Sequence, residues 1–342
     1  MDCPGSACGE LPREDQHRFH PSSRQAVTAG APTPAVSQSP RHLGALAQFG
    51  LVIVCVVVAG SAIVAGRSVS AAASVTGFQS IVQGTVPQFV VRCAFSHAAT
   101  DDPIVFPGDP GASHRHDFFG NRTTDAFSTP DSMLGTDTSC QQALDTAAYW
   151  SPTLFDHGVP VVPQGADVYY RPGPRIDPTS VRPYPHGLVM ISGDAMAMEP
   201  QSTKFVGWAC GSGGDPQVAA PVCPPDAPLR LKVVFPDCWD GRSLDSADHH
   251  SHMAASVDGR CPAGHPVPVP QLQLTVRYPI HGEGHELNLA PGSMLGGHAD
   301  FVNAWDQTEL ESQVRLCLNR VLVCGVISNK AEDVERPLPS RS

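Results

Sequence analysis

Proline and glycine interrupt this chain so often that long regular helices have little room. The 342 residues include 34 prolines and 31 glycines, whereas aromatic residues make up only 6%. Proline lacks a backbone donor and glycine readily adopts turn conformations, so both favour turns and irregular connections. The sequence therefore predicts a loop-rich fold of short elements, and its length is sufficient for a sizeable buried core.

One segment, residues 43–66, is strongly apolar and carries no charge. A helix of this length, rising about 1.5 Å per residue, can cross roughly 30 Å of hydrocarbon. Arginines precede the segment, which places the N-terminus in the cytoplasm and the rest of the chain outside. A signal peptide is the alternative interpretation. Both predict export, with the protein either held in the cell membrane with an extracellular C-terminal domain or secreted.

Eight of the 11 cysteines follow this apolar segment. An even number in an exported domain predicts a disulfide framework, and the spacings do not fit a zinc ribbon. The pairs expected from proximity in sequence are Cys210 with Cys223, Cys238 with Cys261, and Cys317 with Cys324. The candidates are Cys93, Cys140, Cys210, Cys223, Cys238, Cys261, Cys317 and Cys324.

Composition divides the chain into five parts. Residues 1–42 are polar and predict a disordered cytoplasmic tail, followed by the membrane anchor or signal peptide at 43–66. Small residues at 67–88 predict a stalk. The folded extracellular domain is expected over 89–329, beginning at the β-branched run FVVRCAF, and a disordered tail over 330–342.

Short strands are expected within the folded domain at 186–192, 229–235 and 271–279. Each segment is rich in β-branched residues or alternates polar with apolar residues, and proline or glycine bounds it. Helical periodicity is convincing only at 303–322. The predicted fold is mainly β, a loop-rich sandwich or jelly-roll-like single domain with a C-terminal helix, stapled by disulfides.

Charge and missing motifs exclude several classes of protein. The formal net charge is −11, and no basic run alternates with aromatic residues, so nucleic acid is not expected as a partner. The chain has no P-loop, no G-x-G-x-x-G turn and no G-x-S-x-G elbow. The first two absences argue against nucleotides as partners, and the third argues against a serine hydrolase.

Histidine and aspartate are concentrated in three short segments, GASHRHDFFG, SADHHSH and GGHADF. Residues two apart in an extended segment point to the same face, so each segment can present a pair of side chains together. Imidazole and carboxylate bind zinc and other divalent ions, which makes such an ion the expected cofactor. The expected metal ligands are His114, His116, His250 and His252. The expected catalytic residues are Asp117, His298 and Asp300, the last two as ligand or general base.

Tryptophans lie near these segments and could contact a substrate. Flat apolar rings beside polar groups suit a sugar ring, although a core tryptophan with a bonded N–H is the commoner use. The expected substrate contacts are Trp150, Trp239 and Trp305. A metal-free pair of carboxylates, as in glycosidases, is a second mechanism that the sequence allows.

Long ordered blocks of the chain resemble a known family. The blocks include RCAFSHAATDDPIVFPGDPGASHRHDFFGN (92–121), FPDCWDGRSLDSADHHSHMA (235–254) and GHADFVNAWD (297–306). They are similar to the domain of unknown function 1996 family of exported fungal and actinobacterial proteins. The resemblance implies export, a single compact domain and an association with cell walls and carbohydrate, but it brings no established activity or catalytic residues.

The sequence thus favours an exported, metal-dependent hydrolase or lyase that acts on extracellular polysaccharide. A non-catalytic cell-wall or glycan-binding module is the main alternative, and a purely structural surface domain is another.

Overall fold

The computed structural model describes residues 86–329, and every regular element within them is short. The expected membrane segment at 43–66, both expected tails and most of the stalk lie outside the described residues. Within 86–329 no helix is both long and apolar enough to cross a membrane. The first strand begins at Gln88, close to the predicted start of the folded domain.

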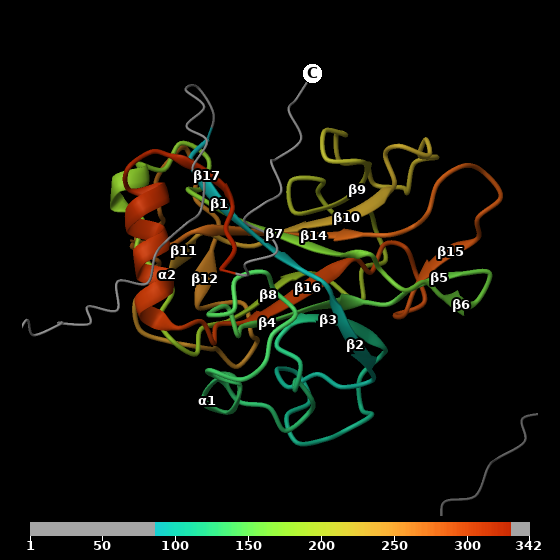
Figure 1. The fold of residues 1–342 in the computed structure, drawn as a ribbon, viewed down its shortest axis with the longest axis horizontal. Helices are drawn as coiled ribbons and strands as arrows, with labels where there is room; N and C mark the ends of the chain where they lie inside the picture. The colour runs from blue at the N-terminus through green and yellow to red at the C-terminus, as the bar shows by residue number, and fades with distance from the viewer. Residues whose placement is uncertain (1–85, 330–342) are drawn as a thin grey trace, which may run out of the picture. The chain divides into compact units, whose positions relative to one another are not determined.

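A six-stranded sheet forms one layer of the domain, in the order β17-β1-β7-β14-β10-β9 (Figure 1). Its neighbouring strands are antiparallel except for β1 and β17, which are parallel. The predicted strands at 229–235 and 271–279 form two of its central members. The strands are β1 (Gln88–Cys93), β7 (Gly165–Arg171), β9 (Val206–Cys210), β10 (Leu229–Val234), β14 (Gln271–Arg277) and β17 (Val323–Val326).

A five-stranded antiparallel sheet forms the second layer, in the order β2-β3-β4-β16-β8. The predicted strand at 186–192 contributes its edge strand β8. The strands are β2 (Phe95–Ala99), β3 (His116–Gly120), β4 (Ala148–Pro152), β8 (Val189–Gly193) and β16 (His298–Val302). Strands far apart in sequence are thus neighbours, because β16 lies between β4 and β8.

The two sheets pack face to face and bury the main core between them. Alternate residues of each strand point inward, so Leu231 and Leu274 of one sheet meet Tyr149 and Phe301 of the other. A smaller apolar cluster covers the opposite face of the five-stranded sheet, where Trp150 packs with residues of the long connections. That sheet is therefore buried on both faces, and the predicted β-sandwich is confirmed.

Two small sheets and four short helical segments complete the fold. Figure 1 shows α2 at one end of the sandwich and the β15-β5-β6 sheet at the other. One small sheet contains β5 (Leu154–Asp156), β6 (Val159–Pro160) and β15 (Leu287–Leu289), and the other contains β11 (Cys238–Trp239), β12 (Met253–Ala254) and β13 (Val267–Pro268). The helical segments are α1 (Pro130–Met133), the 3₁₀ turn η1 (Pro178–Ser180), α2 (Gln307–Gln313) and the π-helical η2 (Val314–Leu318).

The predicted C-terminal helix is present but shorter than its periodicity suggested. The side chain of Asp306 accepts a hydrogen bond from the Glu309 backbone N–H and caps the first turn, so α2 begins at Gln307 rather than at Asn303. Residues 303–306 instead form an extended connection in which Trp305 pairs with Asp145. Leu310 lies on the buried side of the helix and joins the main core.

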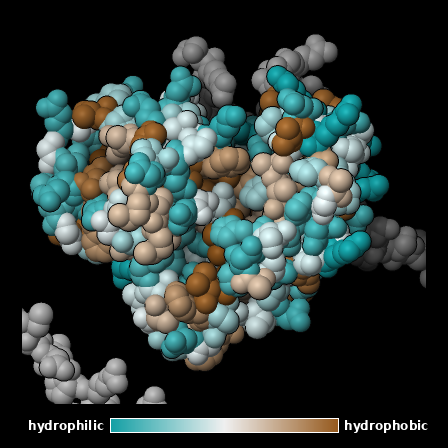
Figure 2. All heavy atoms as spheres, turned by 180° about the vertical axis from the view of Figure 1, so that it is seen from behind, coloured by the Kyte–Doolittle hydropathy of each residue, from teal (hydrophilic) through white to brown (hydrophobic). Residues whose placement is uncertain are grey.

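Four disulfides cross-link the described part of the chain. The three predicted pairs are all present, and the fourth joins Cys93 of β1 to Cys140. Viewed from behind, hydrophobic side chains are scattered in small groups among hydrophilic ones (Figure 2). That face of the molecule therefore presents no broad apolar surface.

Candidate metal centre

Two histidines project from the outer face of the five-stranded sheet, on the strands that flank β4. His116 is paired with Pro152 of β4, and Asp300, two residues after His298, is paired with Trp150 of the same strand. Strand alternation puts His298 and Asp300 on one face, together with His116. Backbone register alone therefore brings these three side chains together across the sheet.

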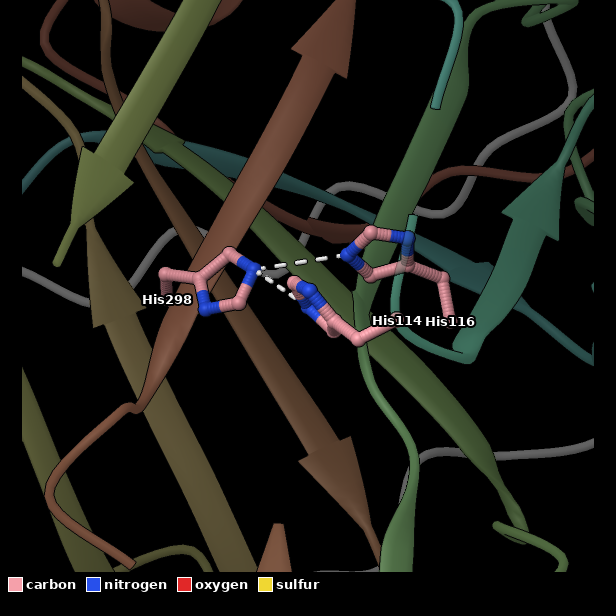
Figure 3. Close-up of side chains that lie close together, drawn as sticks. All are labelled: His114, His116 and His298. Atoms are coloured by element: carbon pink, nitrogen blue, oxygen red, sulfur yellow. Dashed lines mark hydrogen bonds between the residues drawn. The ribbon is translucent and has the colours of Figure 1, made fainter. Parts of the chain in front are cut away.

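A third histidine completes the group from the loop that leads into β3. His114 Nε2 lies 3.2 Å from His298 Nε2, and His116 Nε2 lies 3.4 Å from the same atom. Figure 3 shows the rings of His114 and His116 converging on His298 from the opposite side of the cluster. Nitrogen ligands of a tetrahedral zinc ion lie roughly 3.3 Å from one another, given Zn–N bonds of about 2 Å. Both distances to His298 Nε2 match that spacing, and the ligand atoms of all three histidines lie within 4.8 Å of one another.

The other ring nitrogens fix the tautomers of two of these histidines. Nδ1 of His298 lies 2.8 Å from the Gly296 carbonyl oxygen, and Nδ1 of His116 lies 3.1 Å from that of Asp101. A carbonyl only accepts, so both Nδ1 atoms carry the proton and donate it. In the neutral rings both Nε2 atoms therefore bear lone pairs. Two lone pairs facing each other at 3.4 Å cannot form a hydrogen bond, but they can share a cation.

Burial keeps these rings in the neutral form that binds metal. Desolvation lowers the pKa of His114 and of His298 to about 4. Burial lowers the pKa of His116 well below its usual value, and the two neighbouring histidines lower it further. All three rings are therefore unprotonated at neutral pH and need no proton loss before they bind a metal ion. His114 is the most exposed of the three, so access from solvent is on its side.

One carboxylate, that of Asp300, lies close to the histidine cluster, and that of Asp102 lies near Asp300. Oδ2 of Asp300 is 3.9 Å from His298 Nε2, is fully buried and has no hydrogen-bond partner among the described residues. Burial raises the pKa of Asp300 well above its usual value, and the nearby charge of Asp102 raises it further. An unpartnered buried carboxylate oxygen is costly unless a cation compensates for it. Its position next to three imidazoles supplies a place for that cation.

The structure does not bring His250 and His252 to this centre. Nε2 of His252 donates to the Val189 carbonyl at 2.7 Å, and its Nδ1 lies 2.9 Å from Ser246 Oγ. Both ring nitrogens are thus occupied in holding the 246–252 loop against β8. Convergence of the three sequence clusters was the expectation, and only the first and third of them meet.

Asp117 lies on the inner face of the same sheet, facing away from His116. Its Oδ1 accepts a hydrogen bond of 2.8 Å from Thr153 Oγ1. Burial is the main reason why the pKa of Asp117 is raised to about 7. The side chain therefore lies between the two sheets, where it has no direct contact with the histidine cluster.

The three tryptophans expected to contact a substrate lie in different environments. Trp305 is fully buried, and its Nε1 donates to Tyr170 Oη at 3.0 Å. Trp150 is also fully buried, against Phe118 on the outer face of the five-stranded sheet. Trp239 is partly exposed, and its Nε1 donates to the Ser243 carbonyl at 2.7 Å. Of the three, Trp239 alone has surface that a ligand can touch.

A second group of potential ligands has a different explanation. Cys93, Cys140 and Asp145 lie close together, but the two cysteines are joined in a disulfide. Disulfide sulfurs are not the thiolates that bind metal ions. The three histidines therefore form the candidate metal centre of the described residues.

Comparison with protein families gives a match over residues 102–305, to the model described as Domain of unknown function (DUF1996). The chain belongs to the DUF1996 family. The matched region contains the three histidines, Asp102 and Asp300, whereas α2 and the Cys317–Cys324 disulfide follow it. Searches of curated proteins and of solved structures return no significant match.

Around the start of the DUF1996 domain, the sequence offers Asp101 and Asp102 as candidate carboxylates of a metal-free mechanism, but it does not show which groups surround the histidines. Asp102 binds the backbone N–H groups of Ile104 and Val105 and lies near Asp300. The carbonyl groups of Asp101 and Gly296, which orient His116 and His298, carry no sequence signal because every residue has one. The Asp-Asp pair before Pro103 was visible in the sequence, but its proximity to Asp300 depends on the sheet.

Proposed function

We propose that the domain binds a divalent metal ion, with zinc as the best-fitting ion, through Nε2 of His114, His116 and His298. The supporting observation is the facing pair of Nε2 lone pairs on His116 and His298, whose tautomers are set by backbone carbonyls. Without a cation, an Nε2–H of His114 can donate to His298 Nε2 at 3.2 Å, but the Nε2 lone pair of His116 still faces another acceptor. A cation between the rings would bind all three.

We further propose that the domain is an exported enzyme, a metal-dependent hydrolase or lyase that acts on extracellular polysaccharide. The uncharged segment at 43–66 would hold it at the membrane or direct its secretion. When bound, a divalent ion with three protein ligands polarises a substrate oxygen and increases the acidity of coordinated water. Burial raises the pKa of Asp300, so its carboxyl holds a proton in the metal-free protein. A cation bound beside it would favour the ionised form, and Asp300 would then be placed to accept a proton, because its oxygen lies 3.9 Å from His298 Nε2.

A structural metal that ties β3 to β16 is the second candidate function. It is supported by the complete burial of His116 and by Asp300, which could supply a fourth ligand and close the coordination sphere. The partial exposure of His114 favours the catalytic proposal, since an open position needs a route for substrate. The two candidates differ in activity rather than in metal binding.

Metal analysis of the purified full chain tests the binding proposal. After dialysis the protein should retain zinc, and zinc at 100 times its dissociation constant should stabilise the fold by about 2.7 kcal/mol in thermal unfolding. The His298→Ala variant should lose both the bound zinc and the stabilisation. His186→Ala is the matched control, because His186 pairs with Asp131 at the surface, and it should behave like the wild type.

An absence of zinc and of any thermal shift with zinc, manganese or copper in the wild type would reject the metal proposal. Circular dichroism of His298→Ala shows whether a loss of zinc reflects unfolding instead. Catalysis is tested separately by incubating metal-loaded and chelated protein with a panel of polysaccharides and analysing the products. Metal-dependent products support the enzyme, and metal binding without products supports the structural role.

A further inference from the structure

The outer face of the six-stranded sheet is strongly basic, although the chain as a whole is acidic. Its strands contain five basic residues and a single acidic one, Asp167. In the whole chain, by contrast, 33 acidic residues outnumber 22 basic ones. Each of the five alternates with core residues and so points away from the core. The basic face consists of Arg92, Arg171, Arg230, Lys232 and Arg277.

The single carboxylate does not neutralise this face. Asp167 is shared by three guanidinium groups, with Arg92 Nε at 2.9 Å, an Arg230 terminal nitrogen at 3.2 Å and Arg277 Nε at 3.6 Å. The Nε atoms of Arg230 and Arg277 are buried and have no hydrogen-bond partner among the described residues. Unsatisfied guanidinium donors beside an excess of positive charge favour the binding of an anion.

Arg171 and Lys232 are the two basic residues of this face that form no ion pair with another described residue, whereas the other three pair with Asp167. The guanidinium of Arg171 lies 4.4 Å above the ring of Tyr169, and its Nε donates to Gln88 Oε1 at 2.9 Å. Its partners are neutral, so they hold the side chain in place and leave its charge available. Burial lowers the pKa of Lys232, which marks an ammonium held partly away from water.

A groove of about 680 Å³ extends from this face. Its volume is in the range of roughly 300–1,000 Å³ that is usual for ligand sites. Lys204 and Lys232 supply positive charge, Gln271 and Gln273 supply amides, and Phe205 supplies a ring that is 36% exposed. The groove also has two carboxylates, of which Asp258 is paired with Arg175 and Asp237 is buried. These groups match the parts of a charged sugar, since cations bind carboxylates, amides bind hydroxyl groups and a ring packs on the apolar side of a pyranose.

We propose that the basic face and this groove bind an anionic polysaccharide, one that carries carboxylate groups on its sugars. Nucleic acid fits less well, because a single strand stacks successive bases on several exposed aromatic rings, whereas Arg171 covers Tyr169 and Phe205 is only partly exposed. The inference takes polysaccharide as the partner from the proposed function, and it requires no metal ion.

Binding of the full chain to polygalacturonate, measured by calorimetry in a mild detergent with a chelator present, tests this inference. The wild type should bind, and its affinity should fall as salt is added. The Arg171→Gln/Lys232→Gln variant should bind about tenfold more weakly, as expected when charged hydrogen bonds are lost. The two substitutions leave the ion pairs of Asp167 intact, because its partners are Arg92, Arg230 and Arg277. Arg315→Gln/Arg320→Gln is the control, because it makes the same charge change on exposed residues near the C-terminus and should bind like the wild type.

Two comparisons do not depend on the variants folding. Fully methyl-esterified pectin and dextran, which lack free carboxylates, should not bind the wild type. Equal binding of these neutral polymers, or tighter binding of single-stranded DNA than of polygalacturonate, would overturn the inference. Because the chelator is present throughout, failure here leaves the metal proposal standing, and failure of zinc binding leaves this inference standing.

Discussion

At the residue scale, the tautomers of His116 and His298 mark the histidine cluster as a potential metal site, because their facing Nε2 atoms cannot bond each other. His116 and His298 each donate from Nδ1 to a backbone carbonyl, which leaves both Nε2 atoms as acceptors. His252 uses the same kind of carbonyl contact through Nε2, and its Nδ1 contacts Ser246. The orientation of the ring therefore separates a potential ligand from a structural histidine, although both occur in similar sequence patterns.

The Asp300→Asn substitution should affect metal binding and metal-free stability in different ways. Asparagine keeps the shape of the side chain but removes the buried carboxylate, so zinc affinity should fall by about 10–100-fold. The free energy of unfolding of the metal-free protein at neutral pH should stay the same or increase. The buried Asp300 must take up a proton on folding because its pKa is raised, whereas the amide of asparagine needs none. Zinc titration against a competing chelator and urea denaturation measure the two quantities.

Asp117→Asn is the control for this prediction, because Asp117 is buried on the opposite face of the sheet and bonds Thr153. Its zinc affinity should equal that of the wild type. If Asp300→Asn binds zinc as tightly as the wild type, Asp300 has no part in the centre.

Asp145 should make stability depend on pH. Tyr149 Oη donates to both of its carboxylate oxygens, at 2.8 and 3.0 Å, and burial raises the pKa of Asp145 well above its usual value. The folded state therefore holds the proton more tightly than the unfolded chain. Proton binding by Asp145 therefore stabilises the folded state. The contribution is complete below the pKa of about 4 that an aspartate has in the unfolded chain, and it is lost as the pH rises through the pKa of Asp145 in the folded state.

The Asp145→Asn variant measures that effect, because its amide cannot ionise. As the pH rises from about 4 towards 8, the variant should gain stability relative to the wild type in urea denaturation. Other titrating groups cancel in this difference. A difference that stays constant over the whole range would contradict the assignment.

At the element scale, the order of the strands determines which predicted residues meet. The i, i+2 pattern correctly placed His298 and Asp300 on one face of β16, because alternation is a local property of a strand. It could not show that β16 lies two strands from β3, since that position depends on pairing through β4. The same pattern was misleading in SADHHSH, where a loop replaces the expected extended segment.

Gly193 at the end of β8 keeps the start of β16 in place. It pairs with His298 at a φ of +89°, and an added Cβ would lie 2.4 Å from the Gly297 carbonyl oxygen and 2.7 Å from His298 Cα. The Gly193→Ala substitution should therefore displace His298 and weaken zinc binding. Gly282→Ala is the control, because Gly282 has a φ of +81° but nothing near its added Cβ.

Both alanine variants should lose about 1–2 kcal/mol of stability from the left-handed backbone conformation. Only Gly193→Ala should also lose zinc affinity, measured by competition with a chelator. Equal zinc affinity in the two variants would mean that the contact between β8 and β16 does not position the histidine.

At the scale of the whole molecule, the sequence predicted the architecture better than the site. Proline, glycine and alternating strands predict a β-sandwich because they are local preferences that packing reinforces, and three disulfides follow from proximity in sequence. The side of a sheet on which an aromatic residue lies depends on the complete fold. Trp305 was therefore expected at the site, whereas it lies in the core.

Trp305 joins the two sheets of the sandwich through their tyrosines. Its Nε1 donates to Tyr170 Oη of β7, and the hydroxyl groups of Tyr170 and Tyr149 of β4 lie 2.6 Å apart. The Trp305→Phe variant removes this donor and leaves a gap in the core, so it should lose about 2–4 kcal/mol in urea denaturation. Zinc affinity and polysaccharide binding should be unchanged. Weaker zinc or polysaccharide binding by Trp305→Phe, with unchanged stability, would contradict the core role. It would mean that Trp305 contacts a ligand and that the two sheets separate at this point.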